Sequence, residues 1–282
     1  MTEFVKMHGL GNDYIFIDCL DREPPQQPGQ LSVRMSDRHF GAGSDGLVLI
    51  LPPENKAAHC RMRMFNSDGS EAEMCGNAIR CVAKLVYERG RIAEKKICVE
   101  TGAGLLSLDL QVEGGKVRSL RVDMGPPRLS PAEIGLRLQG ERFIGQTIQA
   151  GGRDFEVSCV SMGNPHAVIF LDEPVEEFPV SQYGPAVEND PVFINRTNVE
   201  FVNVRGENKL RQRTWERGSG ETLACGTGAS AVAVASILTG RCSPGTVDIQ
   251  LNGGWLSIHW QQGENVFMTG PAEEVYTGCW PE

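Results

Sequence analysis

The sequence predicts an α/β (α+β) protein of two pseudo-symmetric domains, each a curved, largely antiparallel sheet or barrel wrapped around a central helix. Three observations predict this class: an internal repeat, a helix that is apolar on every side, and strand pairs joined by glycine-rich turns. The 282 residues are enough for two domains of ordinary size, each with its own core.

The repeat is clearest where Met74-Cys-Gly-Asn77 returns as Ala224-Cys-Gly-Thr227. Residues 61–110 and 211–260 align without a gap, and at least ten of these positions are identical. Composition alone predicts about three identities in fifty. The two stretches are therefore predicted to be copies of one supersecondary unit.

Each copy contains one helix that starts at a cysteine. The first runs from Cys75 towards Gly90, and the second runs from Cys225 towards Gly240, so each ends where a glycine cap is expected. The second helix has almost no polar face and must be enclosed on all sides.

The other elements are predicted as short strands, one short helix and loops. The expected strands and turns follow apolar alternation and glycine-rich breaks. They are a strand and tight turn from Phe4, a strand 14–19, a surface loop 21–30, a helix 32–38, strands 47–51 and 61–65, and hairpins pairing 97–100 with 105–110 and 247–251 with 256–260. The predicted domains are 1–122 and 123–269, with the tail 270–282 returning to the first and a linker at Gly125-Pro-Pro127.

Composition narrows the class of partner. A net charge of −9 without a basic run argues against nucleic acid and anionic membranes, so a small molecule is the expected ligand. No apolar run approaches the roughly 20 residues that span a bilayer. The amino terminus lacks the apolar core of a secretory signal, and a cytoplasmic location is expected. The nine cysteines are not closely paired, which favours reduced thiols.

The paired thiols are the strongest candidate for chemistry. Unpaired N–H groups and the dipole at a helix start favour a thiolate there. If the repeats face each other, Cys75 and Cys225 lie on opposite sides of one ligand, an arrangement suited to inverting a carbon stereocentre. The N–H groups of Gly76-Asn77 and Gly226-Thr227 would then hold a carboxylate. Alternatively, the two cysteines are simply small buried caps.

These residues resemble the diaminopimelate epimerase family over nearly the whole chain. The matching motifs are His8-Gly-Leu-Gly-Asn-Asp-Tyr14, Phe65-Asn-Ser-Asp-Gly-Ser70, Met74-Cys-Gly-Asn77, Gly163-Asn-Pro-His166, Asn198-Val-Glu-Phe201 and Glu216-Arg-Gly-Ser-Gly-Glu-Thr222 leading to Ala224-Cys-Gly-Thr-Gly228. The resemblance implies interconversion of LL- and meso-diaminopimelate in lysine and peptidoglycan-precursor biosynthesis, without pyridoxal phosphate or any other cofactor. It implies that Cys75 and Cys225 are the acid/base pair.

The same resemblance assigns roles to other positions. His166 and Glu216 would bias the protonation of the thiols, and Glu216 would also face the reacting amino group. The implied substrate-binding residues are Asn12, Asn66, Gly76, Asn77, Asn164, Asn198, Glu216, Arg217, Gly226 and Thr227. No metal is expected, and the assembly is left open, with a homodimer as one option. The chain departs from some members at Gly46, where they carry Gln, so that side-chain contact is not available here.

Competing interpretations can be separated by experiment. A proline or hydroxyproline racemase also uses two cysteines, but its usual pattern has His where this chain has Asn77. A thiol redox or scaffold protein would not exchange a substrate α-hydrogen with solvent. Oxidation is also expected to be able to join Cys75 to Cys225 and abolish activity reversibly.

Two further motifs have little support. Gly41-Ala-Gly-Ser-Asp-Gly46 matches a dinucleotide fingerprint by spacing, but a strand rather than a helix is expected after it. His59, Cys60, Cys75 and Cys81 have no known metal-ligand spacing.

Overall fold

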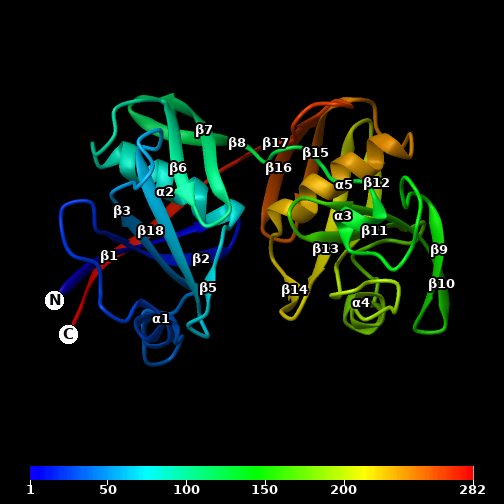
Figure 1. Ribbon diagram of the computed structural model, residues 1–282, viewed down its shortest axis with the longest axis horizontal. Helices are drawn as coiled ribbons and strands as arrows, with labels where there is room; N and C mark the ends of the chain where they lie inside the picture. Colours follow the sequence, from blue (N-terminus) through cyan, green and yellow to red (C-terminus); the bar gives the residue numbers. More distant parts are fainter. Residues whose placement is uncertain (282) are drawn as a thin grey trace. The chain divides into compact units, whose positions relative to one another are not determined.

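The computed structural model describes residues 1–281, and the chain divides into two compact units. Unit 1 contains Met1–Asp123 and the described part of Thr269–Glu282, and unit 2 is Met124–Met268. Figure 1 shows one long central helix among strands in each unit. The predicted mixed α+β class is confirmed.

Unit 1 is a largely antiparallel sheet with two helices. Its elements are β1 (Thr2–Gly9), β2 (Asn12–Asp18), α1 (Pro28–Ser36), β3 (Gly46–Leu51), β4 (Cys60–Asn66), β5 (Glu71–Ala72), α2 (Gly76–Glu88), β6 (Lys96–Thr101), β7 (Gly104–Glu113), β8 (Lys116–Asp123) and β18 (Glu273–Trp280). The strands pair in the order β18, β1, β2, β3, β4, β6, β7, β8. Only the β2–β3 and β4–β6 steps of this ladder are parallel.

Unit 2 repeats this pattern. Its elements are α3 (Pro131–Ile134), β9 (Gln146–Ala150), β10 (Arg153–Ser161), β11 (Pro165–Phe170), α4 (Val180–Glu188), β12 (Asn198–Gly206), β13 (Lys209–Glu216), β14 (Gly220–Thr222), α5 (Gly226–Leu238), β15 (Gly245–Leu251) and β16 (Gly254–Trp260); β17 (Phe267–Gly270) follows. The order is β9, β10, β11, β12, β13, β15, β16, with parallel steps at β11–β12 and β13–β15.

Strand register confirms the internal repeat. In unit 1 Cys60 pairs with Val99, and in unit 2 Leu210 pairs with Ile249, which is the same pairing shifted by 150 residues. Helices α2 and α5 have bounds related by the same shift. The predicted hairpins are also present, because β6 joins β7 and β15 joins β16 through two-residue turns. The two copies therefore share backbone geometry as well as sequence.

The central helices are enclosed by their sheets. Helix α2 packs against β1, β2, β6, β7 and β8, and α5 packs against β10, β11, β12, β15 and β16. As predicted, almost the whole length of α5 is buried. Helix α2 differs from the expectation in one respect, because its polar residues Arg80 and Lys84 are buried too. Burying each helix fixes the position of the cysteine that directly precedes it.

Two predicted boundaries were wrong. The helix expected at 32–38 begins four residues earlier, at Pro28, so the predicted surface loop 21–30 is shorter. Proline has a preset φ and lacks an N–H, and it suits the first turn of a helix. The strand expected at 14–19 covers Asn12–Asp18 instead, because Asn12 already pairs with Gly9 across the turn.

All nine cysteines lie in the part of the chain that the structure describes, and all are free thiols. Within residues 1–281, no helix has the length and apolar character needed to cross a bilayer.

Candidate active site

Each unit contains one copy of the repeated cysteine site, and each copy is called a half-site. The first half-site is built around the start of α2. Cys75 has extended backbone angles and directly precedes the helix, so its side chain lies beside the first turn. The Cys75 thiol donates to Asn12 Oδ1 at 3.5 Å, and Asn77 Nδ2 donates to the same oxygen at 3.2 Å. Sequence-predicted residues Asn12, Gly76 and Asn77 are thus gathered at this thiol.

A buried arginine supports this helix start. The Arg80 side chain donates to Gly76 O at 2.7 Å, to Asn77 Oδ1 at 2.9 Å and to Pro271 O at 3.1 Å. Burial lowers the pKa of the Arg80 guanidinium, and attraction to the Cys81 and Cys75 sulfurs opposes that shift. Arg80 therefore places positive charge beneath the Cys75 half-site.

Tyr14 and Asp45 also border this half-site. Burial raises the pKa of the Tyr14 phenol, Cys75 and Asp45 raise it further, and a hydrogen bond with Asn12 opposes them. Asp45 Oδ2 accepts from Asn12 Nδ2 at 2.8 Å and from the Asp13 backbone N–H at 3.0 Å. Neither residue was among the sequence-predicted site residues.

Asn66 lies at the edge of this group. Its Nδ2 donates to Ser70 Oγ at 3.0 Å. It borders Gly46, where an added Cβ would lie 2.2 Å from Phe65 O, 3.0 Å from the Tyr14 ring and 3.2 Å from Asn66 Cα. A side chain at position 46 would therefore require the Phe65 carbonyl and its neighbours to shift in this chain.

The second half-site is built around the start of α5. Cys225 Sγ accepts from the Gly228 backbone N–H at 3.3 Å and lies 3.5 Å from Thr227 Oγ1. Burial raises the pKa of the Cys225 thiol well above its ordinary value, and the Glu216 and Glu200 carboxylates raise it further; the Thr227 and Gly228 contacts act in the opposite direction. The surroundings of Cys225 thus favour its protonated form.

Of the two acidic residues that act on this thiol, Glu216 has the larger effect on its pKa. Burial raises the pKa of Glu216, and hydrogen bonds from Thr222 and Cys225 oppose the shift. Thr222 Oγ1 donates to Glu216 Oε1 at 2.6 Å. A buried carboxyl whose pKa is raised and which contacts a thiol can exchange a proton with it.

His166 belongs to a chain of polar groups in which His166 and Glu200 are fully buried. Its Nδ1 lies 2.8 Å from Glu200 Oε1, and its Nε2 lies 3.0 Å from Asn164 Oδ1. Asn164 Nδ2 in turn donates to Thr227 Oγ1 at 3.3 Å. Both ring nitrogens of His166 therefore have a polar partner, and the donor and acceptor roles in these two contacts depend on the tautomer of the ring.

Asn198 and Arg217 are joined to each other. The Arg217 backbone N–H donates to Asn198 Oδ1 at 2.8 Å, and the Arg217 side chain donates to Asn195 O at 3.0 Å. Asn198 lies beside His166, its partner in the parallel β11–β12 pair. The side chains predicted for the second copy therefore line one region of unit 2.

Sequence reasoning missed four residues: the buried Tyr14, Arg80 and Glu200, and the partly exposed Asp45. Glu200 had a usable signal, because it is a lone acid in the apolar run Val199-Glu-Phe-Val202. Arg80 had a weaker one, because it interrupts the apolar helix in the first copy only. Charged residues inside apolar elements usually have specific partners.

His166, Glu200 and Cys225 also form a group of potential metal ligands, since their donor atoms lie within 4.8 Å of one another. Within the group His166 Nδ1 contacts Glu200 Oε1 at 2.8 Å, and outside it His166 Nε2 contacts Asn164. This group is not the set of possible metal ligands considered from the sequence. In that set, His59 accepts a hydrogen bond from the Cys98 backbone N–H at 3.0 Å.

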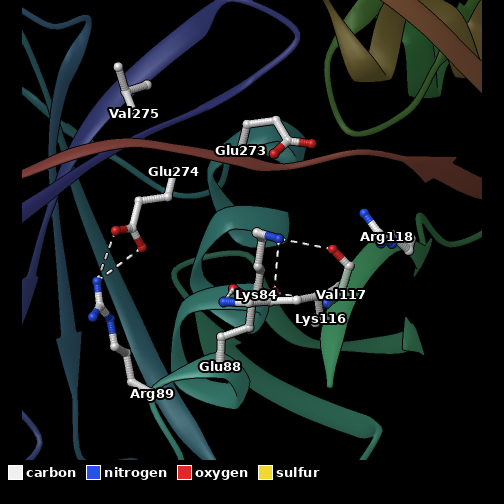
Figure 2. A pocket seen from close by; sticks show the side chains of 9 residues that line it. All are labelled: Lys84, Glu88, Arg89, Lys116, Val117, Arg118, Glu273, Glu274 and Val275. Carbon is white, nitrogen blue, oxygen red and sulfur yellow. Dashed lines mark hydrogen bonds and ion pairs between the residues drawn. The ribbon is translucent and has the colours of Figure 1, made fainter. Parts of the chain in front are cut away.

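A separate cavity of about 430 Å³ lies at the opposite end of α2 from Cys75 (Figure 2). Its charged walls pair with each other: Lys84 with Glu88 at 3.0 Å, Arg89 with Glu274 at 3.0 Å, and Lys116 with Glu88 at 3.5 Å. Since no cysteine lines it, it is not part of the candidate active site.

Solved structures define the class to which this fold belongs. A hydroxyproline epimerase from Agrobacterium vitis is 17% identical, with a TM-score of 0.69 and coverage of 98% of this chain and 91% of that one. A phenazine biosynthesis protein of the PhzF family from Bacillus anthracis is 14% identical, with a TM-score of 0.71 and coverage of 98% of each chain. The fold is therefore that of a two-unit α+β class that includes an epimerase.

Sequence comparison identifies the family within this class. The family model described as diaminopimelate epimerase matches residues 4–130 and 158–275. The diaminopimelate epimerase of Pelotomaculum thermopropionicum is 50% identical over 280 residues, covering 99% of this chain and 98% of that protein. That of Acetivibrio thermocellus is 52% identical over 276 residues, covering 98% and 97%. The chain belongs to the diaminopimelate epimerase family and is an isomerase.

Proposed function

We propose that the protein interconverts LL- and meso-diaminopimelate by a two-base mechanism in which Cys75 and Cys225 act on opposite faces of one α-carbon. The observation that supports this most directly is the repeated placement of a thiol at the start of an enclosed helix in both units. A pair of acid/base groups is what inversion requires, because a proton leaves one face and another arrives on the opposite face.

The proton balance is simple. One cysteine, as thiolate, takes the α-hydrogen as a proton and becomes a thiol, while the electron pair of the broken C–H bond stays on carbon. The other cysteine, as thiol, gives its proton to the opposite face and becomes a thiolate. The reverse reaction exchanges the two roles, and no external oxidant or reductant is needed.

The developing charge needs stabilisation. Electrons left on the α-carbon spread onto the α-carboxylate, and the helix starts at Gly76-Asn77 and Gly226-Thr227 offer backbone N–H groups to that carboxylate. Each preorganised donor of this kind contributes about 2.7–4 kcal/mol. We therefore propose that both helix starts bind the reacting end of the substrate.

Amide side chains and one arginine suit the distal end. Asn12, Asn66, Asn164 and Asn198 can each donate and accept, as a zwitterionic amino acid end requires. Arg217 can hold a carboxylate through two parallel hydrogen bonds. The Arg217 side chain donates to the Asn195 backbone oxygen at 3.0 Å and forms no ion pair with another described residue. We propose that its guanidinium turns to the substrate carboxylate.

The environment of Cys225 supports roles for Glu216 and His166 in proton balance. The Glu216 carboxyl contacts the thiol and has a raised pKa, and the His166–Glu200 pair lies behind it. We propose that these groups bias the protonation of the thiol pair. Because the two thiols act together, they are expected to titrate as a coupled pair.

The decisive experiment is incubation with LL-diaminopimelate in deuterated water, followed by NMR at the inverted carbon. The wild type should incorporate deuterium and form the meso isomer. The Cys75→Ser and Cys225→Ser variants should each lose epimerisation by at least about 10²-fold. Proline and hydroxyproline are the control substrates, and turnover of either in place of diaminopimelate would reassign the specificity.

A thiol redox or scaffold role is the alternative from another class. It predicts no exchange of substrate α-hydrogen, and epimerisation that survives replacement of both cysteines would refute the two-base proposal. The free thiols fit a reducing compartment, and we propose that the protein acts in the cytoplasm. A homodimer remains a prediction, which light scattering on the purified protein tests.

A further inference from the structure

We propose that Asp45 is a positioning residue of the first half-site, which fixes the Asn12 amide so that its oxygen faces Cys75, with Arg80 fixing Asn77 from the other end. This inference rests on the proposed function. It concerns a residue that touches neither of the reacting thiols, and it explains why two charged side chains lie behind a neutral amide pair.

The contacts form one connected chain. Arg80 Nη2 donates to Asn77 Oδ1 at 2.9 Å, and Asn77 Nδ2 donates to Asn12 Oδ1 at 3.2 Å. Asn12 Nδ2 then donates to Asp45 Oδ2 at 2.8 Å. The Cys75 thiol donates to the same Asn12 oxygen at 3.5 Å.

The charged residues at the two ends of this chain, Arg80 and Asp45, determine the orientation of the amide groups between them. A guanidinium only donates, so Asn77 must turn its oxygen to Arg80 and its NH₂ to Asn12. A carboxylate only accepts, so Asn12 must turn its NH₂ to Asp45 and its oxygen to Cys75. The orientation follows from the chemistry of the ends, because a flip of either amide would oppose like groups.

Asp45 is itself held in place. Its Oδ1 accepts from Arg38 at 2.9 Å, and its Oδ2 also accepts from the Asp13 backbone N–H at 3.0 Å. Arg38 also forms an ion pair with Asp13 Oδ1 at 2.8 Å, and Lys6 forms one with Asp13 Oδ2 at 2.8 Å. Asp13 therefore offers a matched control, since it meets the same arginine without a side-chain contact to Asn12.

The orientation has a chemical consequence at Cys75. An amide oxygen facing the sulfur accepts from the thiol and repels the thiolate, whereas an NH₂ group there would donate to the thiolate. Among the described residues, Tyr14, Arg80 and Cys81 are further titratable or charged groups that interact with this sulfur. Asp45 thus acts on Cys75 through Asn12. It binds the NH₂ group of the Asn12 amide and so keeps the amide oxygen facing the sulfur.

The test is a double-mutant cycle of Asp45→Asn and Asn12→Ala on kcat/KM with diaminopimelate. Asp45→Asn alone should lower kcat/KM about 10- to 100-fold, the effect of one charge-assisted hydrogen bond. In the Asn12→Ala background the same change should cost less than about threefold. Asp13→Asn should stay within about threefold of the wild type. Additive effects, or equal losses in the two aspartate variants, would overturn the proposal.

A second measurement needs no turnover. The pH dependence of iodoacetamide alkylation at Cys75, followed by peptide mass spectrometry, should move to lower pH in Asp45→Asn and not in Asp13→Asn. An unshifted profile overturns the role of Asp45 even if epimerisation is intact. Wild-type protein that alkylates as expected but does not exchange deuterium would instead refute the proposed function.

If Asp45→Asn does not fold, the other end of the chain provides the same test. Arg80→Lys keeps a side chain that only donates and should keep Asn77 oriented, whereas Arg80→Gln can accept and should release it. With both variants folded by circular dichroism, kcat/KM should be lower for Gln than for Lys by about tenfold. Equal activities would contradict the proposal.

Discussion

The two half-sites share a backbone and differ in charge. Arg80 and Ser230 occupy the same position of the repeat, and each bonds the carbonyl four residues earlier: Arg80 to Gly76 O at 2.7 Å and Ser230 to Gly226 O at 3.0 Å. Around Cys225 the buried charged groups are instead the carboxyls Glu200 and Glu216. The fold thus repeats geometry, and side chains set the protonation environment of each thiol separately.

Replacing Arg80 and Ser230 should give the largest difference in stability between equivalent positions of the two units. Arg80→Met should lower the free energy of unfolding by roughly 3 kcal/mol, because two buried acceptors and one partly buried acceptor lose this donor. Ser230→Ala should cost only about 1 kcal/mol, since one hydroxyl bond is lost. Urea denaturation measures both, and equal costs would show that Arg80 is no more than a spacer.

Neutralising Glu216 should affect only the second half-site. Its carboxylate raises the pKa of Cys225, so Glu216→Gln should lower that pKa and move Cys225 alkylation to lower pH. Cys75 in the same sample serves as the internal control and should keep its profile. A shift at both cysteines, or at neither, would contradict separate environments.

The repeated surface ion pairs should differ modestly. Arg63–Glu71 and Arg213–Glu221 have matching bidentate geometry, with bonds of 2.7 and 2.8 Å in each. Arg213 also donates to three backbone carbonyls: Val175, Glu176 and Phe178. Arg63→Lys should cost less than about 1 kcal/mol and Arg213→Lys about 2 kcal/mol. Thermal unfolding measures both costs, and a larger cost for Arg63→Lys than for Arg213→Lys would contradict this prediction.

The glycines after the two helices should show no difference at all. Gly90 has φ +69° and Gly240 has φ +71°, and neither has any atom within 4 Å of an added Cβ. Alanine at either position should cost about 1–2 kcal/mol through backbone strain alone. A gap of more than about 1 kcal/mol between the two variants would show that the copies are not equivalent there.

Much of the fold could be predicted because it depends on local pattern. Apolar periodicity located α5, and glycine-rich turns located both hairpins. The start of α1 was misplaced, since Pro28 suits a helix start and a loop equally well. Asp45 and Arg80 could not be predicted as a pair, because the chain that links them joins residues far apart in the sequence.

By itself the sequence determined the repeat, the two cysteines at helix starts and the family, because register, capping and motif spacing are written along the chain. Only the tertiary structure decided which charges surround each thiol. Burial and hydrogen-bond partners arise when distant strands meet, and these set the pKa of Cys225 and the orientation of Asn12.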